Sequence, residues 1–317
     1  MDRIIEKANA QYFACRIPGM VLTESGTLLA YYECRSARSD WAQIDIKVIR
    51  STNEGRDWET VRIVPGQGNT LNNPMMIVDG DTVHFLYCKN YRELFYCRST
   101  DDGITFSEPL NISYVFENSG YDHTVAAIGP GHGIVHNGKL LLPVWFACNH
   151  TDLKAHHPSF ISTVYSTDHG KTWLCGEKIG NDLLADPSEC ALAIAGDGSV
   201  INSIRNENPQ RQRAIAVSPD GFSRWSIPAF RDTLPDPICM GSMTHRNGTV
   251  FHVNCSSMTH RINLTVNISD DGFRTVRSIA VDDVGGYSDI AVSDDKIFVL
   301  YERDPIHDGL YFKTITY

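Results

Sequence analysis

The sequence lacks the long apolar segment that crosses a membrane, because none of its hydrophobic runs approaches about 18 residues. It also lacks an excess of basic charge: 28 Lys and Arg stand against 38 Asp and Glu, a formal net charge of −10. This balance argues against a nucleic acid or an anionic membrane as a partner held by bulk charge. The first residues carry no apolar leader, so we expect a cytoplasmic protein, unless the sequence is a trimmed part of a secreted one.

The nine cysteines form no Cys-x-x-Cys pair and have no spacing typical of a zinc site. An odd number of scattered cysteines also argues against a disulfide framework, so we expect free thiols in a reducing compartment. Cys15, Cys34 and Cys190 each flank a charged residue. If these stretches are strands, neighbours point to opposite faces, and the three thiols should be buried and unpaired. No cluster of His, Cys or carboxylate residues calls for a catalytic metal, and no cofactor is expected.

A short motif, Ser-x-Asp-x-Gly-x-Thr-aromatic, recurs along the chain. Its five copies are Ser51–Trp58, Ser99–Phe106, Ser166–Trp173, Ser218–Trp225 and Ser269–Val276, which start 48, 67, 52 and 51 residues apart. Asp and Gly favour a turn, Ser can bind nearby backbone amides, and the aromatic residue re-enters a sheet. Some copies depart from the pattern: the first has Asn53 for Asp, the fourth has Phe222 in the Gly place, and the fifth has Val276 for the aromatic residue.

Short runs rich in Val, Ile, Tyr and Phe separate these turns, for example Leu28–Cys34 and Val250–Cys255. No helix of three turns is predicted. About four strands per repeat and about six repeats predict an all-β, six-bladed β-propeller that forms a single domain over residues 1–317. The His-rich stretch Asn149–His157 falls in the longest interval and is expected to be a surface loop.

Several arginines stand within or beside the predicted strands of different repeats: Arg16, Arg35, Arg205 and Arg261. Propellers place ligands where the inner strands of the blades converge. Arginines that converge from different repeats of an acidic protein suggest an anion site. The planar guanidinium group suits a carboxylate, which it binds through two parallel hydrogen bonds.

The sequence resembles the sialidase (neuraminidase) family from about residue 13 to its C-terminus, with the matching segments in family order. The repeated turns resemble the Asp boxes (BNR repeats) of that family, and Arg16-Ile17-Pro18 resembles its Arg-Ile-Pro motif. The other matching segments are Arg35–Asp45 with Asp40, Gly129–Ile134, Glu189 before Asp197–Ile201, Arg205, Arg261, Tyr287–Ile290 and Leu300–Glu302.

The resemblance implies a retaining exo-sialidase that removes terminal α-linked sialic acids from glycoconjugates. A sialoside carries a carboxylate on its anomeric carbon, so a neutral tyrosine is a better nucleophile than a second carboxylate. The family roles then fall on Tyr287 as the nucleophile, Glu189 as its base and Asp40 as the acid, which later activates water. The remaining roles are a carboxylate clamp of Arg16, Arg205 and Arg261, support of Arg16 by Glu302, and binding of a ring hydroxyl by Arg35.

Two residue choices and two rival functions stay open at this point. Asp45 competes with Asp40 but lies inside an apolar strand, where structural hydrogen bonds are expected, and His123 and His132 either border the site or pack structurally. One rival function is a glycosidase for another 2-keto sugar acid, such as ketodeoxynononate. The other is a non-catalytic glycan-binding propeller, which needs the arginines but not Tyr287 and its carboxylate partners. Oligomeric state does not follow from the sequence.

Overall fold

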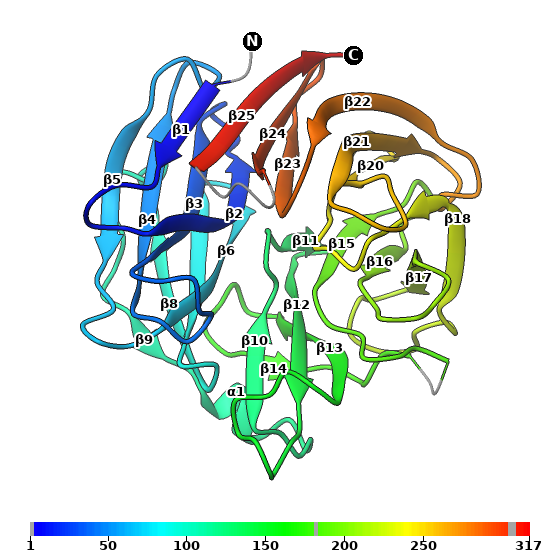
Figure 1. The fold of residues 1–317 in the computed structure, drawn as a ribbon, viewed down its shortest axis with the longest axis horizontal. Helices are drawn as coiled ribbons and strands as arrows, with labels where there is room; N and C mark the ends of the chain where they lie inside the picture. Colours follow the sequence, from blue (N-terminus) through cyan, green and yellow to red (C-terminus); the bar gives the residue numbers. More distant parts are fainter. Residues whose placement is uncertain (1–2, 181–182, 304–308) are drawn as a thin grey trace.

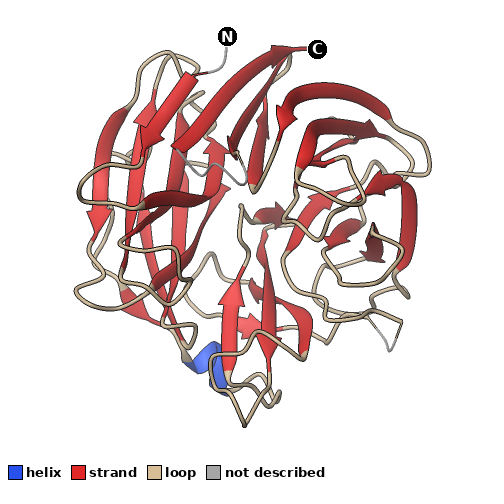
Figure 2. Ribbon diagram, viewed as in Figure 1, coloured by secondary structure: helices blue, strands red, loops and turns tan. Residues whose placement is uncertain are grey.

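The structure is a computed structural model that describes residues 3–180, 183–303 and 309–317. Nearly all of its regular structure is β-strand, and the only helix in these ranges is the four-residue α1 (Tyr114–Glu117) (Figure 2). None of the helical structure described has the length and apolar character that a membrane crossing requires. Six antiparallel sheets surround a central axis (Figure 1), which confirms the predicted six-bladed β-propeller.

Each sheet is one blade, numbered here in chain order. Blade 1 contains β2 (Ala14–Leu22), β3 (Leu28–Arg35), β4 (Ile44–Ser51) and β5 (Glu59–Val64). Blade 2 contains β6 (Leu71–Asp79), β7 (Thr82–Lys89), β8 (Glu93–Ser99) and β9 (Leu110–Asn111). Blade 3 contains β10 (Val125–Ile128), β11 (Ile134–His136), β12 (Lys139–Ala147), β13 (Ser159–Ser166) and β14 (Leu174–Cys175). Blade 4 contains β15 (Cys190–Ile194), β16 (Val200–Ile204), β17 (Gln212–Ser218) and β18 (Ala229–Pro235). Blade 5 contains β19 (Ser242–Arg246), β20 (Thr249–Cys255), β21 (Ile262–Ser269) and β22 (Arg277–Val284).

Blade 6 joins the two ends of the chain. It contains β23 (Ser288–Val292), β24 (Lys296–Glu302), β25 (Gly309–Thr316) and, as its outer strand, β1 (Arg3–Lys7). The register pairs Arg3 with Phe312 and Lys7 with Gly309. Figure 1 shows the blue first strand beside the red last strand, so the ring is closed by backbone hydrogen bonds between its ends.

The inner and outer strands of a blade differ in burial, as the packing of blades against one another requires. All eight residues of β3 are buried, because this strand has a neighbouring strand on each side and a neighbouring blade on each face. The outer strand β5 is largely exposed. The nine cysteines are free, and Cys15, Cys34 and Cys190 are buried as predicted.

The repeated motifs form turns that pack against the preceding blade. In the first three, the Ser hydroxyl accepts a hydrogen bond from the backbone N–H of the Gly, for example Gly55 to Ser51 at 2.9 Å. These glycines have positive φ, and a Cβ added at Gly55 would lie 2.2 Å from Phe312 of blade 6. Glycine is therefore needed both for the turn and for the approach of the neighbouring blade.

The fourth and fifth turns depart from the predicted alignment. In the fourth, Ser218 accepts its bond from Gly221, three residues on instead of four, so Gly221 and not Phe222 occupies the Gly place. In the fifth, Phe273 occupies that place with φ 62° and is fully buried. Its ring lies in the same apolar cluster as Ala193 and Ile201 of blade 4, where the other turns receive a side chain from their neighbour.

Two of the inner strands, β2 and β6, are interrupted near the axis by bulges at X-Pro pairs. Ile17-Pro18 in β2 and Asn73-Pro74 in β6 both have positive φ at the residue before proline, and the strand register shifts at each. Such bulges bend a strand and redirect its side chains. They divide β2 and β6 into a first part toward one end of the axis and a last part toward the other.

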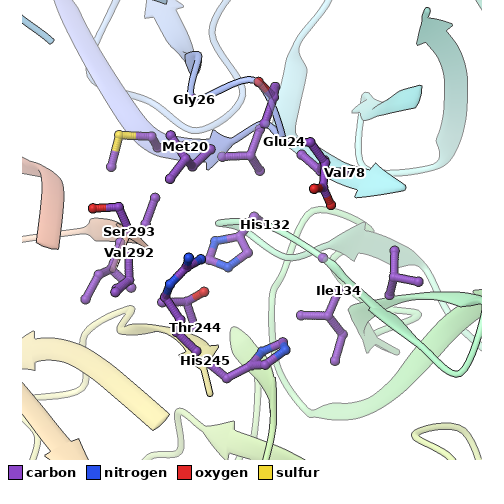
Figure 3. Close-up of a pocket in the computed structure, with 18 of the residues that line it drawn as sticks. Met20, Glu24, Gly26, Val78, His132, Ile134, Thr244, His245, Val292 and Ser293 are labelled. Atoms are coloured by element: carbon purple, nitrogen blue, oxygen red, sulfur yellow. The ribbon is translucent and has the colours of Figure 1, made fainter. Parts of the chain in front are cut away.

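Each end of the axis contains a cavity. The last parts of the inner strands line one cavity of about 520 Å³, with His132 near its middle and Thr244 and His245 along one side (Figure 3). The first parts line the other, which contains the charged residues singled out in the sequence.

Candidate active site

The charged residues predicted from five different segments meet in one cavity of about 240 Å³. Its lining includes Arg16, Arg35, Asp40, Glu189, Arg205, Arg261 and Tyr287, together with Tyr91, Trp145, His156, His157 and Glu207. Residues separated by as many as 271 positions thus share one site because the ring brings the first parts of the inner strands together. Glu302 is buried behind the lining.

Tyr287, Glu189 and Arg205 form the centre of this site. The Tyr287 hydroxyl donates to Glu189 Oε1 at 2.6 Å and accepts from Arg205 Nη1 at 2.8 Å. Arg205 Nη1 also contacts Glu189 Oε2, and the Arg205 backbone N–H donates to the Glu189 carbonyl at 3.1 Å. Because Glu189 precedes β15 and Arg205 follows β16, the pairing of these strands holds the acid and the guanidinium side by side.

The surroundings of Tyr287 keep its hydroxyl protonated. Its side chain is 8% exposed, and burial, reinforced by the charge of Glu189, raises the pKa of Tyr287 above its usual value, although Arg205 and Arg261 act in the opposite direction. A phenol with a raised pKa becomes a nucleophile only if a base accepts its proton. The carboxylate that accepts its hydrogen bond is in place to do so.

Two further guanidinium groups lie near the Tyr287 ring. The Arg16 and Arg261 Cζ atoms are 5.3 and 5.4 Å from the ring centroid. Arg16 Nε and Nη2 both donate to Glu302 Oε2, at 3.1 and 3.0 Å. The other oxygen of Glu302 accepts the Ile17 backbone N–H at 2.7 Å, so one carboxylate holds both the bulge and the side chain before it.

Asp40 lies in the β3–β4 loop and is held by Arg35. Arg35 Nη1 donates to Asp40 Oδ1 at 2.6 Å, and its Nε donates to the fully buried Glu33 at 2.8 Å. Arg35 is 1% exposed, whereas the Asp40 side chain is 49% exposed. Burial alone would raise the pKa of the Asp40 carboxyl, but the contact with Arg35 outweighs it and lowers that pKa.

The competing residues lie elsewhere. Asp45 is buried and accepts hydrogen bonds from the Tyr12 hydroxyl at 2.9 Å and the Gly66 backbone N–H at 2.8 Å, which is the structural role expected of it. His132 borders the cavity at the other end of the axis, where its Nδ1 lies 2.8 Å from Asp289 Oδ1. His123 packs against Phe146. Neither histidine lines the candidate active site.

An aromatic wall was missed by the sequence analysis. Tyr91, Trp145 and His156 line the cavity, and their ring centroids lie 5.0 to 6.1 Å apart. Trp145 Nε1 and His156 Nε2 are buried without a hydrogen-bond partner among the described residues. Burial lowers the pKa of His156, so its ring is neutral at neutral pH. The His-rich stretch was correctly expected to be a loop, but no signal marked His156 as a residue that turns inward.

The rim contains a histidine between two carboxylates. His157 Nδ1 lies 3.9 Å from Asp186 Oδ1, and its Nε2 lies 3.8 Å from Glu207 Oε1. Because opposite nitrogens of one ring face the two acids, this geometry favours ionic contacts over joint coordination of one ion by all three side chains.

Comparison with known proteins gives consistent matches. Residues 26–299 match the family described as BNR repeat-like domain. The chain is 27% identical to a sialidase of Bacteroides fragilis over 93% of its own length and 61% of that protein. It is 28% identical to an exo-alpha-sialidase of Arthroderma benhamiae, over 94% of this chain and 80% of that one. Among solved structures, it superposes on the Hadza microbial sialidase Hz136 with a TM-score of 0.82 and 26% identity, over 96% of this chain and 66% of the other.

Proposed function

Because the chain belongs to the sialidase family of BNR-repeat proteins, we propose that it is a glycoside hydrolase: a retaining exo-sialidase that removes terminal α-linked sialic acids from glycans. The observation that carries this proposal is the 2.6 Å hydrogen bond from the Tyr287 hydroxyl to Glu189, made in a cavity that four arginines also line. A glycan-binding propeller needs the arginines but has no use for a tyrosine aligned with a base.

Recognition begins with the substrate carboxylate. Arg16, Arg205 and Arg261 present three guanidinium groups to one cavity, where Glu302 contacts Arg16 and Glu189 contacts Arg205. A carboxylate on the anomeric carbon is attracted by these positive charges and can accept planar guanidinium hydrogen bonds. With this group bound, the anomeric carbon lies over the Tyr287 hydroxyl.

The first chemical step forms a bond from the Tyr287 oxygen to the anomeric carbon and breaks the glycosidic C–O bond. The tyrosine proton passes to Glu189, and the Asp40 proton passes to the departing oxygen. In the second step Asp40 removes a proton from water, which displaces the tyrosine, and Glu189 returns the proton to the phenolate. Two displacements at the same carbon retain its configuration.

Asp40 and Arg35 have different roles in the proposed reaction. Asp40 is exposed enough to reach a glycosidic oxygen, and Arg35 fixes its carboxylate through the 2.6 Å contact. The Arg35 guanidinium group forms two ion pairs: its Nη2 contacts the Glu33 carboxylate and its Nη1 contacts the Asp40 carboxylate. A positioning role for Arg35 is therefore supported by a contact, whereas its binding of a ring hydroxyl stays a prediction.

The aromatic wall favours sialic acid over ketodeoxynononate. In the six-membered sugar ring, C5 lies opposite C2, so a substrate anchored by its C2 carboxylate directs its C5 substituent away from the arginines. Sialic acids carry an acylamino group at C5, and ketodeoxynononate carries a hydroxyl. The wall of Tyr91, Trp145 and His156 offers apolar surface and unpartnered N–H capacity that suit the larger group.

The test compares an aryl α-sialoside with the corresponding ketodeoxynononate glycoside by fluorophore release. We expect the sialoside to be cleaved with the higher kcat/KM, by about tenfold or more, and the α-anomer to appear first in the NMR spectrum of the products. Faster cleavage of the ketodeoxynononate glycoside would assign the alternative substrate. Binding of sialic acid without release from either glycoside would identify a glycan-binding propeller.

A further inference from the structure

Three side chains that the proposed reaction does not use meet beside the base of the His-rich loop. His150 Nε2 lies 3.0 Å from Asp122 Oδ2 and 3.5 Å from Cys148 Sγ. The three donor atoms all lie within 4.8 Å of one another. His150 and Asp122 are exposed, and Cys148 is half-buried, so the cluster is open to solvent.

The fold brings these residues together through the register of blade 3. In the antiparallel pair β10–β12, Val125 faces Ala147, and beyond the strands the Thr124 backbone N–H still donates to the Ala147 carbonyl at 2.7 Å. Asn149 N–H then donates to the Thr124 hydroxyl at 3.1 Å. Continuing this register places Asp122 opposite His150. The backbone therefore fixes the positions from which the three side chains extend.

We propose that Asp122, Cys148 and His150 form a binding site for one zinc ion. A thiolate, an imidazole nitrogen and a carboxylate are the donors that Zn²⁺ takes in proteins, and three protein ligands leave a fourth position for water. With zinc bonds of about 2.3 Å to sulfur and about 2.0–2.1 Å to nitrogen and oxygen, tetrahedral geometry separates sulfur from nitrogen by about 3.5 Å and nitrogen from oxygen by about 3.4 Å. The observed separations are 3.5 Å between sulfur and nitrogen and 3.0 Å between nitrogen and oxygen, so small side-chain adjustments would complete the geometry.

The charges of the cluster agree with this assignment. The Asp122 carboxylate lies beside the Cys148 sulfur, so the two groups would repel each other if the thiol lost its proton with no cation present. A divalent cation removes this repulsion by neutralising both groups, and zinc binding releases the thiol proton.

An ion here anchors the loop that carries His156 into the active-site cavity. The loop is closed at its base, where Cys148 N–H donates to the Pro158 carbonyl and Asn149 Nδ2 donates to the His157 carbonyl, each at 3.1 Å. Zinc would tie this base to Asp122, on the segment that enters β10. The expected consequence is slower amide hydrogen exchange in residues 148–158.

The test titrates metal-free protein, under reducing conditions and without substrate, first with Zn²⁺ by calorimetry and then with Co²⁺ by absorption. We expect one equivalent to bind and Co²⁺ to give a thiolate charge-transfer band. Cys148→Ser should remove the band, and Cys148→Ser and His150→Ala should each weaken zinc binding by at least about tenfold. Zinc should slow exchange in the loop of the parent protein but not of Cys148→Ser.

Two variants provide matched controls. Cys175→Ser removes the other half-buried thiol, and His169→Ala removes a histidine as exposed as His150 that contacts Asp79 at 2.7 Å. Both should keep the parent affinity and the cobalt band. Absence of binding, or equal binding by the parent, Cys148→Ser and His150→Ala, would overturn the proposal. Since no substrate is present, either result is independent of whether the protein is a sialidase.

Discussion

At the scale of single residues, the proposed mechanism assigns different tasks to three carboxylates, and their surroundings differ accordingly. Glu302 is 1% exposed and has both oxygens occupied by Arg16 and the Ile17 backbone, so it can position but cannot react. Asp40 keeps one side open to the cavity. Glu189 shares its oxygens between Arg205 and the Tyr287 hydroxyl, which suits a group that accepts and returns one proton.

Replacing Tyr287 by Phe keeps the ring and removes the attacking oxygen. We expect kcat to fall by about 10³-fold or more with the fold intact, because the variant lacks the oxygen that forms the covalent bond in the proposed mechanism. Tyr301→Phe is the control: it removes a hydroxyl from a buried tyrosine that also donates to a carboxylate, Asp282 at 2.7 Å, outside the cavity. Steady-state kinetics should show near-parental turnover for Tyr301→Phe only. Substantial turnover by Tyr287→Phe would contradict the tyrosyl mechanism.

Replacing Asp40 by Ala should have an effect that depends on the leaving group. Nitrophenolate needs little protonation as it departs, whereas the alcohol of a natural glycan needs a proton. We therefore expect the variant to lose about tenfold to a hundredfold more kcat/KM on sialyllactose than on nitrophenyl sialoside. Equal losses on the two substrates would show that Asp40 is not the acid.

The pH dependence follows from the lowered pKa of Asp40. In the free enzyme, Arg35 favours the charged carboxylate, so the protonated fraction falls as the pH rises through and beyond this lowered pKa. For natural glycosides, kcat/KM should therefore rise as the solution becomes more acidic. Bound substrate offsets the charge of Arg16, which otherwise lowers the Asp40 pKa, so the decline of kcat should lie at higher pH. Overlapping declines of kcat and kcat/KM would contradict this coupling.

The charged residues of the site could be found in the sequence, whereas its apolar wall could not. Arginines beside predicted strands are unusual enough to attract attention, and their order matches a family. Tyr91 and Trp145 have the composition of ordinary strand residues, and only the geometry reveals that they border a cavity. Similarly, Ile17 gives no sequence signal of its positive φ, although this bulge directs Arg16 toward Tyr287.

At the scale of elements, the repeated turns act as spacers between blades. Where the turn has Gly, the preceding blade supplies the side chain that fills the space: Phe312 at Gly55, Leu29 at Gly103 and Leu141 at Gly221. Where the turn has Phe273, the turn supplies it. The motif was readable from sequence because its turn chemistry is local. The exchange of Gly for Phe273 could not be predicted from the sequence, because the space that this side chain fills lies between two blades.

Gly55→Ala tests this interpretation against a matched glycine. Both Gly55 and Gly138 have positive φ, at 77° and 72°, but an added Cβ meets Phe312 at 2.2 Å in the first case and nothing within 4 Å in the second. Positive φ destabilises both alanine variants, whereas steric overlap with Phe312 destabilises only Gly55→Ala. We expect Gly55→Ala to lose roughly 1–3 kcal/mol more free energy of unfolding, measured by denaturant titration. Equal losses would show that the close approach is not restrictive.

At the scale of the whole molecule, the ring depends on a strand that the sequence analysis did not predict. β1 has only five residues, and much of its surface is exposed, so its pattern is weak. Its position is fixed by partners distant in sequence: β25 pairs with it, the Tyr32 hydroxyl donates to Glu6 at 2.9 Å, and Lys47 Nζ lies 2.5 Å from the same carboxylate. Counting repeats predicts six blades but not which segment completes the last one.

A variant that lacks residues 1–7 should lose this closure. β25 would become an exposed edge, and such edges pair with other chains. We expect a lower midpoint of chemical denaturation and aggregation that increases with protein concentration, detected by light scattering. Glu6→Gln is the control, since it keeps the strand and changes only the contacts of the Glu6 side chain with Lys47 and Tyr32. Parental stability and solubility of the truncated chain would show that β1 is dispensable for the ring.

The pairing of β1 with β25 also limits when the ring can close during translation. β1, which ends at Lys7, is synthesised well before its partner β25, which begins at Gly309. At about 5–20 residues per second, the interval between them is on the order of 15 to 60 s. During that time blades 1 to 5 can form one after another as the chain emerges, whereas blade 6 cannot be completed. Until β25 is synthesised, β1 has no strand to pair with, and the nascent chain must be kept from pairing with other chains during this interval.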